Sequence, residues 1–191
     1  MKTTTLSAVF LAAGACAMPA VAETRAYSVQ NYTDGERIAD KAMRMFGKRV
    51  VWGAGSVHGP TKGGFDCSGL TLFCVYRGAR KIIRTFVHSA VQSNTFAENS
   101  PSTNNTTRAA PTAQAQYNSV MGKHLPFDEA EPGDLVFWSK KGNCGHGVVH
   151  VGVFHKRGEV VDALLGEKMV ETRSIESTDE RTMCPSVVRF W

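Results

Sequence analysis

The sequence contains a cysteine, a histidine and an aspartate that together suit a thiol-dependent hydrolytic site, and the cysteine is Cys67. It follows Asp66 at the point where a helix is expected to begin. A cysteine attacks as its thiolate, and the dipole and free N–H groups of a helix N-terminus favour that anion. The same N–H groups can stabilise the oxyanion that forms on a carbonyl. Cys67 is therefore a candidate nucleophile, although half of a disulfide or a small core residue would also suit this position.

The candidate base is His150, in a Val-rich segment that predicts a β-strand. Side chains alternate along a strand, so His150 shares one face with Gly152 and Phe154, and we expect the alternate valines to enter the core. The glycine leaves open space where a helix end must approach. A single histidine on a strand is more often structural, so the prediction depends on its combination with Cys67.

The third candidate is Asp162, on the next predicted strand. A hairpin with a three-residue turn between Phe154 and Gly158 places Asp162 directly opposite His150. Opposed Cβ atoms are about 5 Å apart, so the carboxylate can accept the imidazole N–H and stabilise the charged ring. A two-residue turn would shift the register by one and remove this contact. The alternative is a solvent-facing aspartate at the rim of the sheet.

The first 22 residues predict a secretory signal peptide, because Lys2 precedes a short apolar run and small residues lead up to Ala22. The apolar run is shorter than the about 20 residues that span a bilayer, and no later segment is a better candidate. We expect one catalytic domain over 23–191, secreted to the outside or, in a bacterium, to the periplasm.

The number and positions of the cysteines limit which disulfides and metal sites the chain can form. If Cys67 stays free, the mature chain can form one disulfide, and we expect Cys144 to pair with Cys184 while Cys74 is buried. A zinc site from Cys144, His146 and His150 is an alternative, but it lacks the closely spaced ligand pairs of structural zinc. We expect no metal and no cofactor.

The net charge of +5 is mildly basic and could favour an anionic polymer or surface. No cluster of Lys and Arg alternates with aromatic residues, so we expect no nucleic-acid partner. The sequence gives no indication of the oligomeric state.

Helices are predicted before strands along the chain. An amphipathic helix is expected over 34–46, capped by Asp34, and a central apolar helix from Cys67 to about Arg77, capped by Asp66. A polar surface loop is expected over 93–116. Strands are expected over 134–138, 148–154, 159–164, 168–172 and 186–191. This order is typical of an α+β domain with an antiparallel sheet.

Three segments, Phe65–Leu70, Pro132–Phe137 and His150–Phe154, resemble the signature blocks of the NlpC-type cell-wall cysteine peptidases. These are small papain-like enzymes, and the likeness covers about residues 35–165. The resemblance implies a papain-like fold in which N-terminal helices pack on a C-terminal antiparallel sheet. It also implies hydrolysis of amide bonds in peptidoglycan stem peptides, between D-γ-glutamyl and a diamino acid.

The family's nucleophile and base fall on Cys67 and His150, and its third catalytic residue, usually a histidine, falls on Asp162. The resemblance suggests that Asp66 and Ser68 bind the stem peptide, and Trp52, before the nucleophile block, is a further binding candidate.

The sequence departs from the family at Val50 and Val51, where the family commonly has Pro-Tyr, so the substrate preference stays open. Two other functional hypotheses also stay open. One is an amidase or acyltransferase that uses the same site on another substrate. The other is a catalytically inactive secreted binding protein.

Overall fold

The computed structural model describes residues 32–79, 112–156, 158–176 and 181–191. The expected signal peptide over 1–22 and the first part of the expected polar loop, 93–111, lie outside them. No helix among the described residues is long and apolar enough to cross a membrane.

Helix α1 (Asp34–Met43) begins with a capping box. The hydroxyl of Thr33 accepts the N–H of Glu36, and the Glu36 carboxylate accepts the N–H of Thr33. The predicted cap at Asp34 is therefore wrong by one residue, because Asp34 is the first helical residue. The helix also ends three residues before the predicted Phe46, and its buried side includes Ile38 and Ala42.

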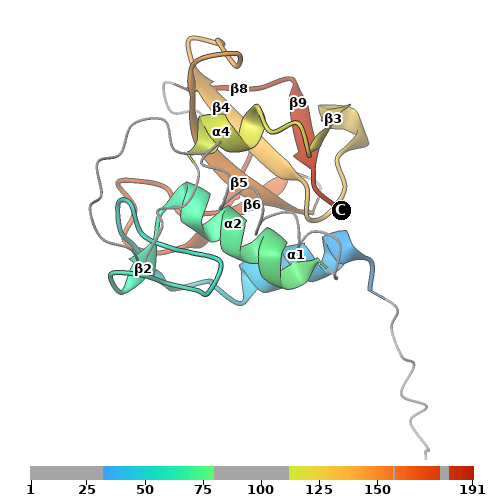
Figure 1. Ribbon diagram of the computed structural model, residues 1–191. Helices are drawn as coiled ribbons and strands as arrows, with labels where there is room; N and C mark the ends of the chain where they lie inside the picture. The colour runs from blue at the N-terminus through green and yellow to red at the C-terminus, as the bar shows by residue number, and fades with distance from the viewer. Residues whose placement is uncertain (1–31, 80–111, 157, 177–180) are drawn as a thin grey trace, which may run out of the picture. The chain divides into compact units, whose positions relative to one another are not determined.

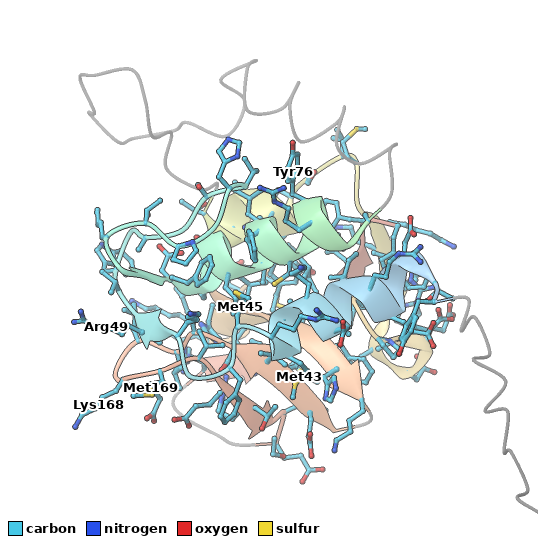
Figure 2. The ribbon with its side chains drawn as sticks, turned by 90° about the horizontal axis from the view of Figure 1, so that it is seen from below. Met43, Met45, Arg49, Tyr76, Lys168 and Met169 are labelled. Carbon is cyan, nitrogen blue, oxygen red and sulfur yellow. A yellow bond between two sulfur atoms is a disulfide. The ribbon has the colours of Figure 1, made fainter. Side chains whose placement is uncertain are left out.

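The chain after α1 runs beside a distant segment. Strand β1 (Arg49–Val50) pairs in parallel with β2 (Gly64–Phe65). The N–H of Val50 also donates to the carbonyl of Lys168, and Arg49 forms an isolated bridge with Met169. Arg49, Lys168 and Met169 accordingly lie together in Figure 2. This pairing fixes the chain that leads to the second helix.

Helix α2 (Cys67–Gly78) is capped as predicted, since the Asp66 carboxylate accepts the N–H of Gly69. Most of its residues are buried, which confirms the expectation of a central helix. Figure 1 shows α2 beside α1, with both helices against strands β5 and β6. The first turn of α2 is thereby held against the sheet.

The main sheet of the described residues is antiparallel, as predicted, in the order β3-β9-β4-β5-β6-β7, with β8 paired to β4. The domain is an α+β fold with its helices before the sheet. The expected strand over 168–172 is shifted to β7, and β3 and β8 were not predicted. The strands are β3 (Lys123–Pro126), β4 (Leu135–Lys140), β5 (Val148–Lys156), β6 (Glu159–Asp162), β7 (Glu171–Ser174), β8 (Arg181–Met183) and β9 (Ser186–Arg189).

Both faces of the sheet are buried. Val151 and Val153 pack with the helices in one core cluster, as predicted for the valine face, while Trp138 and Phe154 belong to a second cluster on the other face. The prediction fails at Val149, which is 38% exposed, because a bulge between β4 and β5 adds one residue there and turns its side chain outward. His150 pairs with Trp138, so it lies on the face of the second cluster and is buried there.

Residues 113–117 form a short helix, α4 (Ala113–Tyr117), where a polar loop was expected up to residue 116. Thr112 caps the helix, and Ala113 and Gln116 are buried. The loop prediction is therefore wrong over its last residues. Polar composition indicated solvent exposure there, but Gln116 is buried because its side-chain amide is hydrogen-bonded.

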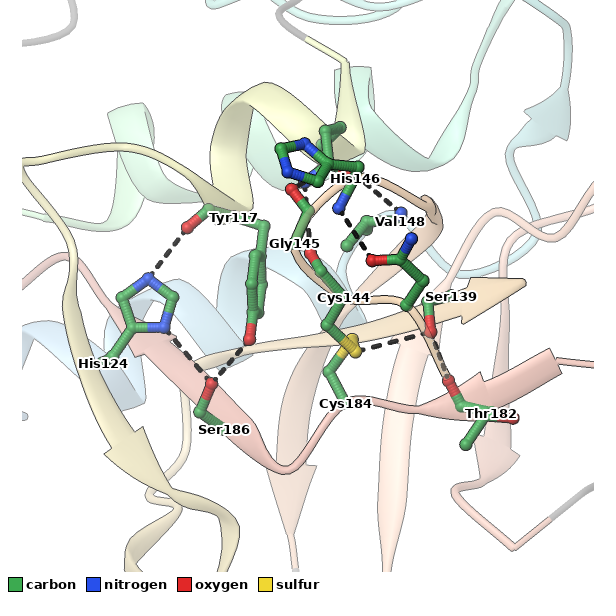
Figure 3. The surroundings of a disulfide bond; sticks show 12 residues. Tyr117, His124, Ser139, Cys144, Gly145, His146, Val148, Thr182, Cys184 and Ser186 are labelled. Atoms are coloured by element: carbon green, nitrogen blue, oxygen red, sulfur yellow. Dashed lines mark hydrogen bonds between the residues drawn. A yellow bond between two sulfur atoms is a disulfide. The ribbon is translucent and has the colours of Figure 1, made fainter. Parts of the chain in front are cut away.

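The predicted disulfide between Cys144 and Cys184 is present, Cys67 is free and Cys74 is buried, all as expected, whereas the burial of Cys67 was not predicted. Figure 3 shows the bridge between the loop that precedes β5 and the segment that joins β8 to β9. Beside it, the Ser186 hydroxyl lies within hydrogen-bond distance of both Tyr117 and His124, so α4, β3 and β9 meet here.

Candidate active site

Cys67 is the first residue of α2, and its side chain packs in the core that α2 forms with β5. Burial and the nearby carboxylate of Asp66 raise the pKa of the thiol from 9.0 to about 12, although hydrogen bonds with the backbone of Val151 and Ser68 lower it. We expected the helix N-terminus to favour the thiolate, but desolvation outweighs that effect. The resting side chain is therefore a neutral thiol.

His150 is nearly fully buried, with 2% of its surface exposed, and lies opposite Trp138 on β4. The two ring centres are 5.3 Å apart. Burial lowers the pKa of the imidazole below its ordinary value of 6.5, against the opposing effect of Asp162. The ring is neutral at pH 7. His150 directly precedes Val151, whose backbone is hydrogen-bonded to the Cys67 thiol. Within the described residues the structure shows no hydrogen bond between the Cys67 and His150 side chains themselves.

The expected contact between Asp162 and His150 is present. Asp162 Oδ2 lies 2.7 Å from His150 Nε2, and the exposed fraction of Asp162 is also 2%. The predicted register is wrong, however. Val153 pairs with Val161 and Phe154 with Val160, which places Asp162 two residues from the position opposite His150. A shift of two keeps the same face of the strand, so the contact survives as a diagonal one.

Gly152 takes the place directly opposite Asp162 when this register is continued. A Cβ atom on Gly152 would lie 3.1 Å from the Cβ of Asp162. The glycine therefore provides the space that Asp162 needs to lean toward His150. The expectation that a helix end approaches this space is wrong, because cross-strand neighbours occupy it.

A fourth residue, Arg173 on β7, completes the buried polar group. Its Nε and Nη2 atoms donate to Asp162 Oδ2 over 3.1 and 2.5 Å. Burial alone would raise the pKa of Asp162, but the hydrogen bonds and charges of His150 and Arg173 lower it below its ordinary value. We did not identify Arg173 from the sequence, because its partner depends on the pairing of β7 with β6.

The charge state of Asp162 settles the tautomer of His150. An ionised carboxylate only accepts hydrogen bonds, so Nε2 carries the proton that it donates to Asp162. In the neutral ring, Nδ1 then has a lone pair and can accept a proton. The pair thus has the arrangement of a general base with an orienting carboxylate.

Asp66 and Ser68 flank the candidate nucleophile and are hydrogen-bonded to each other. Asp66 Oδ1 accepts the Ser68 hydroxyl at 3.0 Å and the Gly69 N–H at 2.7 Å. Both side chains are buried, so both help to fix the first turn of α2. Trp52 differs from them, because it is 72% exposed on the chain between β1 and β2.

The zinc alternative is wrong. Cys144 is consumed by the disulfide with Cys184. Among the described residues, no group of three or more His, Cys, Asp or Glu side chains is placed to hold a metal ion.

The sequence model of the NlpC/P60 family matches residues 47–189, which include Cys67, His150 and Asp162. The chain belongs to the NlpC/P60 family. Members of this family are cysteine peptidases that act on peptidoglycan. The resemblance inferred from the three sequence blocks is thereby confirmed.

Curated relatives carry the same domain within longer proteins. The peptidoglycan endopeptidase RipB of Mycobacterium tuberculosis is 28% identical over 136 residues, which are 67% of this chain and 42% of RipB. A probable endopeptidase p60 of Listeria seeligeri is 29% identical over 126 residues, 66% of this chain and 17% of that protein. The chain thus spans less than half the length of these relatives.

Solved structures confirm the papain-like NlpC/P60 fold. The RipB structure from M. tuberculosis has a TM-score of 0.55 at 25% identity and covers 82% of this chain and 64% of that one. The P60 domain of an M. avium subspecies paratuberculosis antigen has a TM-score of 0.56 at 24% identity, covering 82% of this chain and 94% of the domain.

In this NlpC/P60 domain, α4 connects the helix of Cys67 with the strand of His150. The Gln116 side chain accepts the Thr71 hydroxyl at 2.8 Å and donates to the Ser68 carbonyl at 2.9 Å. The Gln114 side chain accepts the Val148 N–H at 2.8 Å. Gln116 therefore supports the helix of Cys67 and Gln114 supports the strand of His150. The polar composition of this segment predicted a surface loop, so neither role was identified from the sequence.

Proposed function

We propose that the chain is a secreted peptidoglycan endopeptidase that hydrolyses the amide bond between D-γ-glutamyl and a diamino acid in stem peptides. Cys67 is the nucleophile, His150 the base and Asp162 the residue that orients it. One observation carries the proposal. The buried imidazole of His150 is hydrogen-bonded to Asp162 through Nε2, and His150 directly precedes Val151 in the strand. The backbone of Val151 is in turn hydrogen-bonded to Cys67, the only thiol at the start of a helix among the described residues.

The first chemical step starts from a neutral pair. Burial raises the pKa of Cys67 and lowers that of His150, so the proton stays on sulfur until substrate is bound. His150 Nδ1 takes this proton as the sulfur forms a bond to the γ-carbonyl carbon. Asp162 stabilises the imidazolium that results. The N–H groups at the start of α2 are suited to hold the oxyanion.

The second step expels the diamino acid and then restores the thiol. The C–N bond breaks as His150 Nδ1 returns its proton to the leaving amine, which leaves a thioester on Cys67. Water then loses a proton to His150 and attacks the thioester carbonyl. The C–S bond breaks, the γ-carboxylic acid departs, and the thiol recovers its proton. Proton transfer from Cys67 to His150 thus begins only when the substrate is bound.

Asp66, Ser68 and Trp52 form the proposed binding set for the stem peptide. Asp66 Oδ1 is occupied by Ser68 and Gly69, which leaves Oδ2 for a donor on the substrate. The exposed indole of Trp52 offers an apolar surface for a peptide or sugar. Replacement of Trp52 by Ala should raise KM and leave the thermal unfolding midpoint unchanged.

Action outside the cytosol is part of the proposal. The predicted signal peptide over 1–22 and the Cys144–Cys184 disulfide both support it, because disulfides persist in oxidising compartments. The sequence of the secreted chain's N-terminus tests the point. Processing should leave Glu23 first, and retention of residues 1–22 in secreted protein would contradict the leader assignment.

Digestion of purified muropeptides tests the activity. Wild type should release the diamino-acid fragment with a new γ-carboxylate, identified by mass spectrometry, and Cys67→Ala should release none. Cys74→Ala is a matched control, since Cys74 is the other free, buried cysteine of α2. It should keep wild-type turnover if it folds. Equal product from wild type and Cys67→Ala would end the proposal, and cleavage at another bond would end the bond assignment.

Non-catalytic binding of peptidoglycan is the second candidate, and the burial of Cys67 favours it. A thiol with a pKa of about 12 reacts slowly with electrophiles near neutral pH. The two candidates differ when substrate is present. A stem-peptide analogue with a thiol-reactive group at the γ-carbonyl should label Cys67 in an enzyme, whereas a binding protein should retain the analogue without a covalent adduct.

A further inference from the structure

We propose that Arg173 is a positioning residue of this site, which holds the Asp162 carboxylate charged and turned toward His150. The inference rests on the proposed function, because it assigns a role to Arg173 only if His150 and Asp162 act in the reaction. It extends the candidate site to β7, beyond Cys67, His150 and Asp162.

The geometry joins Arg173 to both members of the pair. On one side its guanidinium donates two hydrogen bonds to Asp162 Oδ2, the same oxygen that accepts from His150 Nε2. On the other side its Cζ atom lies 5.2 Å from the centre of the Trp138 ring. The centre of that indole is 5.3 Å from the centre of the His150 ring. Arg173 and His150 therefore share an oxygen and an aromatic neighbour.

The pairing of the strands explains this arrangement. Val160 on β6 pairs with Arg173 on β7, and Asp162 lies two residues after Val160. Residues two apart point to the same face of a strand, so Asp162 and Arg173 are diagonal neighbours on the face that also holds His150. A planar guanidinium on that diagonal can bond the carboxylate and stack on an indole at the same time.

Charge supports the same role. The groups that act on His150 are Asp162 from β6, Arg173 from β7 and Arg181 from β8. From α2, the Cys67 thiol is neutral, and the neighbouring strand β4 contributes the uncharged Trp138 ring. Asp162 raises the pKa of His150, while Arg173 and Arg181 lower it. Arg173 thus keeps Asp162 ionised and offsets part of its effect on the imidazole.

The fold contains a matched ion pair away from the candidate site. Arg189 on β9 donates from Nε and Nη2 to the buried carboxylate of Asp134, over 2.8 and 2.7 Å. Its Cζ atom lies 4.7 Å from the centre of the Trp191 ring. Arg189 therefore also gives a buried aspartate two hydrogen bonds and lies over an indole, although its bonds go to the two different oxygens of Asp134. It is a control that separates a structural role from a positioning role.

The test compares Arg173→Gln, Arg173→Lys and Arg189→Gln in the full chain. Arg173→Gln removes a positive charge near His150, so the acidic limb of kcat/KM should move up by roughly one pH unit. In addition, kcat should fall by about 10-fold or more. Arg173→Lys should leave the limb in place and recover part of kcat, because it keeps the charge and loses the planar fork. Arg189→Gln should lower the unfolding midpoint without moving the limb.

Titration of His150 followed by nitrogen NMR gives a second readout that needs no substrate. Its pKa should rise in Arg173→Gln and stay constant in Arg189→Gln, even if muropeptides prove to be the wrong substrate. Failure of the proposed function therefore remains distinguishable from failure of this inference. An unchanged His150 pKa in Arg173→Gln, or the same change in Arg189→Gln, would overturn the role of Arg173. If Arg173→Gln does not fold, a kcat in Arg173→Lys equal to wild type would overturn it.

Discussion

Nε2 of His150 and Oδ2 of Asp162 are 2.7 Å apart in a buried part of the sheet, and the second of these atoms also accepts from Arg173. Asp162 therefore serves two donors through one oxygen. The shape of the side chain and its charge can be tested separately.

Asp162→Asn keeps the shape and removes the charge. The amide oxygen can still accept from both donors, but it no longer stabilises an imidazolium, so kcat should fall by about 10²- to 10⁴-fold. Steady-state kinetics on muropeptides measures this loss. Asp134→Asn is the control, because Asp134 is also buried and bonded to an arginine. Comparable losses of kcat in both variants would show that the effect is on the fold.

Gly152→Ala tests the space beside Asp162. The added Cβ would lie 3.1 Å from the Cβ of Asp162, so the carboxylate must move by a few tenths of an ångström. Small displacements of catalytic groups are costly, and we expect kcat to fall by about 10-fold while the fold is retained. Gly145→Ala is the control, since its new Cβ would meet its nearest neighbour at 3.7 Å. Wild-type turnover in Gly152→Ala would contradict this account.

The pH dependence of kcat/KM follows from the two shifted groups. A protonated imidazole cannot accept the thiol proton, so activity should be lost as pH falls through the pKa of His150. Burial lowers that pKa, which places the acidic limb below pH 6.5. The thiol of Cys67 stays protonated beyond its usual pKa of 9.0, so no second limb should occur near pH 9. Initial rates between about pH 4 and pH 10 test both limits, and an acidic limb above 6.5 would refute the neutral-pair mechanism.

Removal of the disulfide should weaken the fold. Cys144 and Cys184 are 40 residues apart, and loop entropy predicts that the bridge stabilises the protein by about 4 kcal/mol. Urea unfolding of Cys144→Ala/Cys184→Ala measures the loss in free energy of unfolding. Dithiothreitol should reproduce it in the wild type and have no effect on the double variant. A response of the double variant to the reductant would assign the effect to other groups.

The places of the three candidate residues in the fold were predictable because each is tied to a strong local signal. Asp66 marks the start of α2, which places Cys67 in its first turn. The valines around His150 identify a strand, and the side chain of Asp162 points to the correct face in either of two registers. The register itself was not predictable, because an irregularity between Phe154 and Lys156 changes the turn of the hairpin.

The parts that escaped prediction depend on contacts between distant segments. Nothing in the sequence around Arg173 distinguishes it from an arginine on the exposed side of a strand. Only the pairing of β7 with β6 brings it to Asp162. Gln114 and Gln116 lie in a stretch whose composition is typical of loops. Gln116 is buried and Gln114 is partly buried, and their side-chain amides bond to α2 and β5 respectively. Patterns of hydrophobic residues do not reveal a polar group that is buried with a partner.

The small size of α4 has a consequence for the dynamics of the domain. Five residues do not form a persistent helix alone, so α4 exists only while its anchoring contacts hold. When it frays, the Ser68 carbonyl and the Val148 N–H lose their partners together, so the segments that carry the candidate nucleophile and base loosen in a single event. The Val148 N–H donates to Gln114, so its amide exchange should report the opening rate of α4, and that rate limits how long this geometry lasts.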